Sequence, residues 1–197
     1  MNSPALSAGG RAPRVRVAGL LLAAGSGRRF GSPKALADTG SGPWVLRALD
    51  SLAGLDPVVV VLGAAADQVA ALLPPGVGTV RNQDHASGMG SSLRAGLGAL
   101  AGRQFDAVLV TLVDLPDVGS AVVARLAELA APTVLARAGY HGQPGHPVLI
   151  GREHVGGVAE SAIGDRGARD YLATHRTLLV ECGDLATGID VDTRSQS

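Results

Sequence analysis

Two uninterrupted apolar stretches constrain the fold of this chain more than any other feature of its sequence. They read VVVVL over 58–62 and AVLVTLV over 107–113, and neither alternates apolar with polar residues. A strand with one buried face shows such alternation, whereas a strand of a parallel sheet is covered by helices on both faces and does not. The two stretches therefore predict central strands of a mostly parallel sheet.

Apolar runs alternate with helical patterns along most of the chain, as in repeated β–α units. Segments with apolar residues at three- and four-residue spacing predict helices over residues 43–52, 65–73, 89–101, 120–130 and 167–175. Strands are predicted over residues 15–22, 57–62, 78–81, 107–113, 133–136, 147–150 and 177–181. The whole pattern predicts an α/β fold, a single Rossmann-like three-layer domain with a mostly parallel central sheet.

The organisation of the chain is predicted to be simple. No repeat, low-complexity block or linker divides it, so we expect one domain over residues 15–193. Residues 1–14 lack the apolar segment of a signal peptide and are expected to form a flexible tail, with a short tail at 194–197. The glycine- and proline-rich stretch AGYHGQPGHP, residues 138–147, is predicted to be a mobile loop near a ligand.

Charge and cysteine content exclude several functional classes. Lys plus Arg and Asp plus Glu both total 17, so no overall charge attracts the protein to nucleic acid or to an anionic membrane. The single cysteine, Cys182, excludes an intramolecular disulfide and a multi-cysteine zinc site and fits a reducing cytoplasm. We therefore expect a cytoplasmic protein without nucleic-acid or membrane partners, whose affinity for phosphate comes from a few placed residues.

A glycine-rich, cationic segment follows the first predicted strand directly. Residues 21–36 read LLAAGSGRRFGSPKAL, and the loop after the first strand of an open α/β sheet is a favoured ligand site. Backbone N–H groups of such a loop can surround phosphate oxygens, with Arg28, Arg29 and Lys34 nearby. The alternative is a flexible loop with solvated arginines, and the position after the first strand favours phosphate binding.

The two most familiar phosphate-binding loops do not fit this segment. Counting from Gly25 and Gly27, the third glycine of the dinucleotide fingerprint would fall on Phe30, and the next predicted strand ends without the expected acid. The Walker sequence is absent as well. A nicotinamide, flavin or P-loop nucleotide site is therefore not predicted.

The loop resembles the signature of the MobA-like nucleotidyltransferases, which transfer a nucleotide from an NTP to a phosphorylated acceptor, best known as molybdopterin. Further blocks in the same order resemble that family: residues 82–97, 112–116, 145–150, 164–172 and 190–193. The resemblance covers most of residues 17–193 and is closest to the molybdopterin cytidylyltransferase branch. It implies a fold of the nucleotide-diphospho-sugar transferase type.

The reaction implied by the resemblance is attack of an acceptor phosphate on the α-phosphorus of an NTP, with pyrophosphate as leaving group. A phosphate with a second pKa of about 6 is already anionic near neutral pH, so no catalytic base is obligatory. The enzyme must align two anionic groups and neutralise the charge on the leaving group. A divalent cation, Mg²⁺, is therefore expected as cofactor.

The resemblance also implies roles for individual residues. Arg28 and Lys34 are expected at the β- and α-phosphates, and Asp114, directly after a predicted strand, is expected to hold the metal together with Asp192. Asp117 is expected to cap the next helix. The full set of expected nucleotide-binding residues is Leu22, Ala23, Ala24, Gly25, Gly27, Arg28, Lys34, Asn82, Gly88, Ser91 and Ser92.

The sequence indicates less clearly which residues contact the acceptor and which nucleobase the NTP carries. Acceptor contacts are expected from His146, Asp165, Arg166 and Arg169, although the histidine could simply be bonded in a turn and the charged residues paired with one another. Ala24 favours CTP, because the family associates Leu-Ala-Ala-Gly with cytidylyl transfer, and GTP is the alternative. A transient contact with a molybdoenzyme or its chaperone is expected. A non-catalytic nucleotide or cofactor carrier is the alternative from another functional class.

Overall fold

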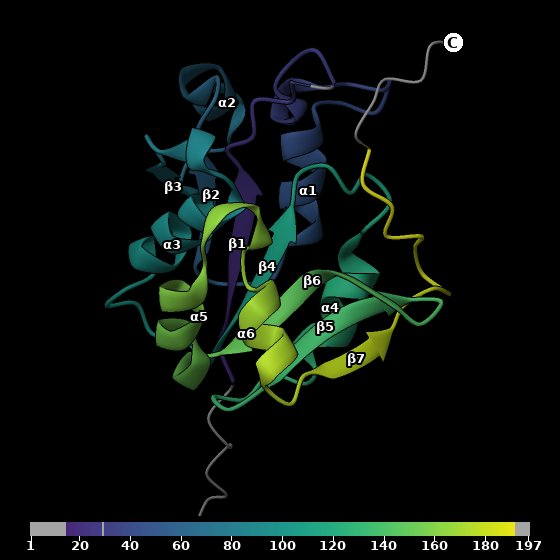
Figure 1. The fold of residues 1–197 in the computed structure, drawn as a ribbon. Coiled ribbons are helices and arrows are strands. Elements are labelled where there is room, and N and C mark those ends of the chain that lie inside the picture. The colour runs from purple at the N-terminus through teal and green to yellow at the C-terminus, as the bar shows by residue number, and fades with distance from the viewer. Residues whose placement is uncertain (1–14, 29, 192–197) are drawn as a thin grey trace, which may run out of the picture.

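The described part of the chain, residues 15–28 and 30–191 of a computed structural model, contains one seven-stranded sheet (Figure 1). The strand order is β3-β2-β1-β4-β6-β5-β7, and every neighbouring pair is parallel except those that involve β6. This confirms the predicted α/β fold with a mostly parallel sheet. The strands are β1 (Val17–Ala23), β2 (Val58–Leu62), β3 (Gly78–Arg81), β4 (Ala107–Leu112), β5 (Leu135–Tyr140), β6 (Gln143–Gly151) and β7 (Leu178–Glu181).

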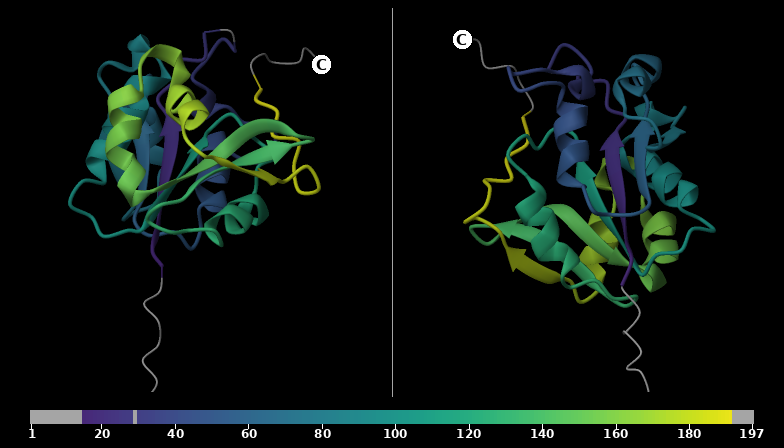
Figure 2. Two further views of the ribbon diagram at one scale, coloured as in Figure 1. Left: turned by 60° about the horizontal axis from the view of Figure 1, so that its bottom comes forward. Right: turned by 180° about the vertical axis from the view of Figure 1, so that it is seen from behind.

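Helices cover both faces of the sheet and complete the three layers (Figures 1 and 2). The α-helices are α1 (Trp44–Ser51), α2 (Ala66–Leu72), α3 (Met89–Ala99), α4 (Ser120–Ala127), α5 (Val155–Ser161) and α6 (Arg169–Thr174). Four 3₁₀ turns also lie within the described residues: η1 (Lys34–Leu36), η2 (His85–Ser87), η3 (Arg152–His154) and η4 (Gly164–Arg166). Helices α1, α2 and α4 pack on one face, and α3, α5 and α6 pack on the other.

Successive residues of the central strands enter two separate hydrophobic cores. In β1, Leu20 belongs to the core under α3, α5 and α6, whereas Leu21 belongs to the core under α1, α2 and α4. Both side chains are fully buried, and burial of a leucine side chain stabilises the fold by about 1.5–3 kcal/mol. Burial on both faces explains why this strand and its neighbours show no apolar–polar alternation in sequence.

Helix α3 packs closely on β1 because Gly96 has no side chain. A Cβ atom at Gly96 would lie 2.5 Å from Cδ1 of Leu20 and 2.8 Å from Cγ2 of Val61. At the other contact of α3, Arg94 donates a hydrogen bond to the carbonyl of Ala162, just after α5. These contacts fix the N-terminal end of α3 at the carboxyl edge of the parallel strands.

The prediction of a mobile loop over residues 138–147 was wrong, because these residues belong to strands β5 and β6 and to the tight turn between them. The turn places His141 at φ 52° and Gly142 at φ 77°, as in a two-residue hairpin of type I′. Ala138 and Tyr140 bury their side chains in the core, which holds β5 in the sheet. Glycine and proline in this segment therefore mark a hairpin within the sheet.

The predicted helices and strands are present within a few residues of their expected bounds, and α5 was not predicted. Gly156 and Gly157 lower the helix propensity of its sequence. A Cβ atom at Gly157 would lie 2.5 Å from the ring of Tyr171, so this glycine allows α5 to contact α6. Of the helices in the part of the chain that the structure describes, none has the length and apolar character that a membrane crossing requires.

Candidate active site

A pocket of about 500 Å³ opens at the edge of the sheet where β1 and β4 end. Its wall combines the loop after β1, the segment from η2 to the start of α3, the end of β4 and η4. The lining residues are Leu22, Ala24, Gly25, Ser26, Gly27, Arg28, Lys34, His85, Ala86, Gly88, Met89, Ser92, Leu112, Val113, Asp114 and Asp165. The pocket therefore lies where ligands bind in open α/β sheets.

The two glycines of the loop after β1 have different roles. Gly27 has φ 60°, and a Cβ atom there would collide with the carbonyl oxygen of Ser32. The carbonyl of Gly27 accepts a hydrogen bond of 2.8 Å from the N–H of Gly31, which closes the turn. Gly25 is exposed, and its missing Cβ has no atom within 4 Å. Gly27 thus shapes the loop, and Gly25 leaves its backbone open to a ligand.

Lys34 and Asp114 meet in the pocket. Nζ of Lys34 lies 2.8 Å from Oδ2 of Asp114, and their side chains are 13% and 19% exposed. Lys34 begins η1 after the glycine loop, and Asp114 lies two residues beyond the end of β4. Because β1 and β4 are adjacent parallel strands, the segments that follow them emerge side by side.

Hydrogen bonds connect residues 187–191 to the segment that follows β4. The N–H of Val191 donates a hydrogen bond of 3.1 Å to the carbonyl of Asp114. Asp117 accepts hydrogen bonds of 2.6 Å from both the N–H and the hydroxyl of Thr187. The expectation that Asp117 caps the next helix was therefore wrong, because α4 begins after Gly119 without a side-chain cap and Asp117 holds the C-terminal segment.

Asn82, Ser91 and Ser92 form a buried polar cluster beside the pocket. The amide nitrogen of Asn82 donates to Oγ of Ser91 at 2.8 Å and to Oγ of Ser92 at 3.0 Å. The hydroxyl of Ser91 is directed to the carbonyls of Asp84 and Gly88, both at 2.9 Å. Ser92 alone of the three lines the pocket, and its hydroxyl proton has no protein partner among the described residues. Asn82 and Ser91 thus orient the wall, and Ser92 faces the pocket.

The wall opposite the glycine loop depends on Gly88 and Gly90. Gly88 has φ 110°, and a Cβ atom there would lie 2.6 Å from Oδ1 of Asp165. A Cβ atom at Gly90 would lie 2.7 Å from the carbonyl oxygen of Ala162. These glycines therefore let the start of α3 approach the segment from 162 to 165, and they bring the carboxylate of Asp165 into the pocket.

Comparison with known proteins decides the family. The sequence profile of the MobA-like NTP transferase domain matches residues 19–178. The chain belongs to the MobA-like NTP transferase family. The match confirms the resemblance predicted from the sequence and the prediction that the protein is a nucleotidyltransferase.

Individual MobA-like relatives have diverse names. Nicotine blue oxidoreductase of Paenarthrobacter nicotinovorans is 38% identical over 195 residues, covering 91% of this chain and 94% of that protein. Molybdenum cofactor guanylyltransferase of Rhodobacter capsulatus is 31% identical over 142 residues, covering 71% of this chain and 66% of that protein. Rv0371c of Mycobacterium tuberculosis superposes with a TM-score of 0.76 and 28% identity, covering 91% of this chain and 94% of that one. A second crystal structure of Rv0371c is a complex with manganese.

Most residues predicted for the nucleotide site of this MobA-like protein line one pocket. Ala23, Asn82 and Ser91 do not, because Ala23 lies in the core and the other two bind within the protein. Asp192 and Arg29 lie outside the described residues. The sequence analysis missed Ser26, His85, Ala86, Met89, Leu112 and Val113, of which His85 follows the end of β3 and could have been found from its place at the carboxyl edge.

The residues predicted for the acceptor separate into two groups. Asp165 lines the pocket itself. Arg166 pairs with Asp170, a residue outside the predicted set, with Nη1 and Oδ2 2.9 Å apart. His146 and Arg169 lie outside the pocket lining. The pKa of His146 is lowered to about 4, mainly by burial and also by the charge of Arg137, whereas the charge of Asp190 acts in the opposite direction. His146 is therefore neutral at neutral pH.

The chemistry of the pocket fits a divalent cation. Asp114 supplies a partly buried carboxylate at the end of β4, beside a glycine loop that can approach phosphate oxygens. Mg²⁺ binds in proteins through one or two carboxylates together with substrate phosphates. In the pocket, Asp114 is the residue that would hold such an ion against a nucleotide.

Proposed function

We propose that this protein is a Mg²⁺-dependent nucleotidyltransferase that moves a nucleoside monophosphate, with CTP as preferred donor, to the phosphate of a molybdopterin-like acceptor. The observation that carries the proposal is the Lys34–Asp114 contact of 2.8 Å beside an open glycine loop. This contact supports the proposal because it brings one cation and one carboxylate together beside the loop, and a polyphosphate with its metal ion requires both. The proposed location of the enzyme is the cytoplasm.

In the proposed mechanism, the backbone at Gly25 approaches the triphosphate and Arg28 neutralises its β-phosphate. Lys34 leaves Asp114 and contacts the α-phosphate. Asp114 and Asp192, which follows Val191 in the sequence, would hold Mg²⁺. The ion, when bound, neutralises charge on the α-phosphate and on the leaving pyrophosphate.

The reaction itself is an in-line displacement. An oxygen of the acceptor phosphate forms a bond to the α-phosphorus as the bond from that phosphorus to the bridging oxygen of the β-phosphate breaks. The electron pair of the broken bond leaves with pyrophosphate. Because the attacking oxygen is already anionic, the protein residues supply alignment and charge neutralisation, and no side chain has to remove a proton.

The preference for a cytosine base is proposed from the wall formed by Ala24 and Ser92. The methyl group of Ala24 narrows the pocket relative to glycine, which suits a pyrimidine. The hydroxyl proton of Ser92 is available to an acceptor on the base or ribose. GTP is the second candidate donor, since a relative named molybdenum cofactor guanylyltransferase is 31% identical.

Pyrophosphate release separates the proposed function from its rivals. The protein is incubated with Mg²⁺, molybdopterin and each NTP in turn, and pyrophosphate is followed. CTP-dependent release supports the proposal, and GTP-dependent release assigns the guanylyl reaction. NTP binding without release with any acceptor would indicate a carrier. Because one relative is named nicotine blue oxidoreductase, conversion of nicotine blue is measured in parallel, and its turnover without pyrophosphate release would overturn the proposal.

A further inference from the structure

Arg137, in β5, is a half-buried cation that has no acidic partner among the residues that the structure describes. Its Nε and Nη2 atoms both donate to the carbonyl of Gly145, at 3.3 and 3.1 Å. Within residues 15–28 and 30–191, no carboxylate forms an ion pair with it. Since a charge that is partly removed from water is costly unless it is compensated, this arrangement points to an anion that is supplied from outside the protein.

A second cation lies close enough to act on Arg137. Burial lowers the pKa of Arg137, and the charge of Arg169 lowers it further. Arg169 is exposed at the start of α6 and, like Arg137, has no acidic partner among the described residues. Two neighbouring arginines without a carboxylate between them repel one another, and an anion between them reverses that repulsion.

The register of the sheet places Arg137 near the nucleotide pocket. Arg137 pairs with Val148 of β6, and Val148 pairs with Val110 of β4. Paired residues of neighbouring strands point to the same face, so Arg137 lies on the face that α3, α5 and α6 cover. Two residues beyond Val110 on that face is Leu112, which lines the pocket.

Helix α6 brings Arg169 to this same face. Leu172 packs in the core with Val148 and Leu135, so α6 lies on the sheet above β5 and β6, as Figure 1 shows. The 3₁₀ turn before α6 carries Asp165 of the pocket wall. The segment from 165 to 169 therefore leads from the pocket toward Arg137.

We propose that Arg137 and Arg169 form a phosphate-binding site beside the nucleotide pocket, and that this site holds the phosphate of the acceptor. The inference rests on the proposed function for the identity of its ligand. A phosphate monoester is a dianion with several acceptor oxygens, and the planar guanidinium group binds such oxygens in pairs. Arg137 retains Nη1 for this purpose while Gly145 fixes its other side.

Inorganic phosphate is the probe that tests this site without any turnover. Phosphate is titrated into the full-length protein, alone and with a saturating non-hydrolysable CTP analogue and Mg²⁺, and binding is measured by calorimetry. The variants are Arg137→Gln, Arg169→Gln and the matched control Arg176→Gln, which removes an exposed arginine just after α6. Loss of one charge-assisted contact is expected to weaken phosphate binding about tenfold or more in the first two variants.

The control Arg176→Gln should bind phosphate as the wild type does. Binding that is unchanged in Arg169→Gln, or absent from the wild type, overturns the proposal. Because Arg169 is exposed, its substitution decides the matter even if Arg137→Gln fails to fold. Competition between phosphate and the CTP analogue would assign the arginines to the triphosphate and overturn the acceptor site.

A failure of the phosphate site can be distinguished from a failure of the proposed function. If pyrophosphate is never released but both arginine variants lose phosphate binding, the anion site stands and the transfer reaction fails. If release occurs, Arg169→Gln should raise the KM for the acceptor about tenfold while the KM for the NTP stays unchanged. An equal effect on both KM values contradicts the assignment.

Discussion

The ammonium group of Lys34 lies 2.8 Å from the carboxylate of Asp114, and this contact joins the segments that follow two neighbouring strands, β1 and β4. Both groups are needed for other contacts in the proposed reaction, the lysine at a phosphate and the acid at a metal ion. In the structure each neutralises the other. In the proposed reaction, ligand binding therefore separates Lys34 from Asp114 and gives each of them a new partner.

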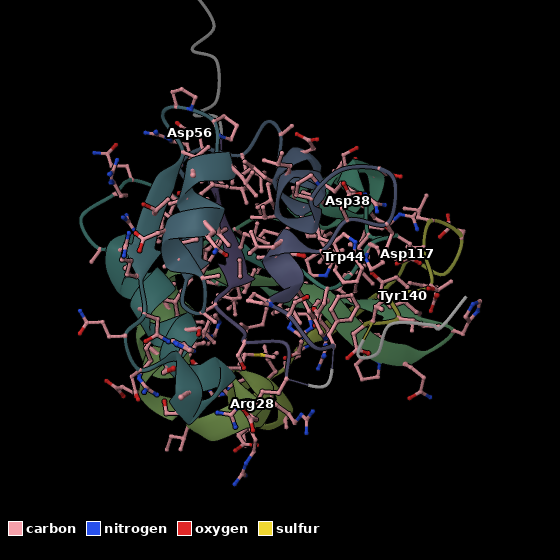
Figure 3. The ribbon with its side chains drawn as sticks, turned by 90° about the horizontal axis from the view of Figure 1, so that it is seen from above. Arg28, Asp38, Trp44, Asp56, Asp117 and Tyr140 are labelled. Carbon is pink, nitrogen blue, oxygen red and sulfur yellow. The ribbon has the colours of Figure 1, made fainter. Side chains whose placement is uncertain are left out.

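Replacement of Asp114 should abolish most of the activity. We expect Asp114→Asn to lower turnover about a hundredfold or more, because a preorganised charge at the reacting phosphate is lost. Pyrophosphate release measured over a range of Mg²⁺ concentrations checks this. Asp56→Asn is the matched control, since Asp56 is 82% exposed and lies away from Arg28 and the pocket (Figure 3). Turnover that is equal in the two variants would remove Asp114 from the mechanism.

Replacement of Lys34 should raise the affinity for the metal ion and lower the affinity for the nucleotide. In Lys34→Gln the carboxylate of Asp114 loses its cationic partner, so the nucleotide-free protein should bind Mn²⁺ more tightly than the wild type. Nucleotide binding should weaken because a phosphate contact is lost. Electron paramagnetic resonance of Mn²⁺ and calorimetry with CTP measure the two effects. Metal binding weakened together with nucleotide binding would contradict the exchange of partners.

Gly25 offers a test in which stability and binding are separated. A Cβ atom there meets nothing within 4 Å, so Gly25→Ala should leave the free energy of unfolding within about 0.5 kcal/mol of the wild type. Nucleotide affinity should nevertheless fall, since the methyl group stands where the triphosphate approaches the backbone. Urea denaturation and calorimetry with CTP give the two quantities. Unchanged affinity would mean that the triphosphate does not bind at this loop.

Replacement of two glycines of α3 by alanine should change the free energy of unfolding in opposite directions. Gly96→Ala places a methyl group 2.5 Å from Leu20 and should destabilise the fold by about 1–3 kcal/mol through overpacking. Gly98→Ala meets no atom within 4 Å and should stabilise it by about 0.5–1 kcal/mol, because alanine is the better helix former. Chemical denaturation of both variants checks the pair. Equal effects would contradict the described packing of α3 on β1.

The partly buried His146 predicts a stability that depends on pH. Its pKa is lowered from 6.5 to about 4, mainly by burial, so the unfolded chain binds the proton more tightly than the folded protein. The stability is therefore intact above pH 6.5 and is lost as the pH falls toward 4. The loss attributable to this group is at most about 3.5 kcal/mol, because a pKa unit corresponds to about 1.4 kcal/mol.

The matched variant for that prediction is His146→Gln, which cannot titrate in this range. Urea denaturation of both proteins at a series of pH values between 4 and 7 should show a smaller loss of stability in the variant. A wild-type curve with the same slope as the variant would show that His146 titrates normally.

The framework of the fold and the nucleotide loop could be predicted from the sequence for a physical reason. Strands that are buried on both faces are continuously apolar, and a glycine loop after the first such strand has few structural uses. The predicted bounds of the single domain and its tails stay a prediction. The sequence did not point to Arg137 as a candidate, because this residue follows an apolar run and its surroundings in the described part of the chain become visible only in the folded protein.

The contacts of polar residues could not be predicted in the same way. Asn82 and Ser91 were expected at the nucleotide; their hydrogen bonds within the protein were not foreseen, and their contact with a nucleotide stays a prediction. Asp117 was expected to cap α4, but Thr187 from a distant segment provides two donors. In each case the choice between a local and a distant partner is made by the tertiary structure.

The reversed direction of β6 has a consequence for how such a protein can change during evolution. The nucleotide side of the edge is built from the segments that follow β1, β3 and β4, whereas the side near Arg137 depends on the hairpin that joins β5 to β6. A hairpin can lengthen, shorten or exchange side chains without altering the connections of the parallel half. Descendants of one ancestor can thus keep a common donor site and diversify in what they modify.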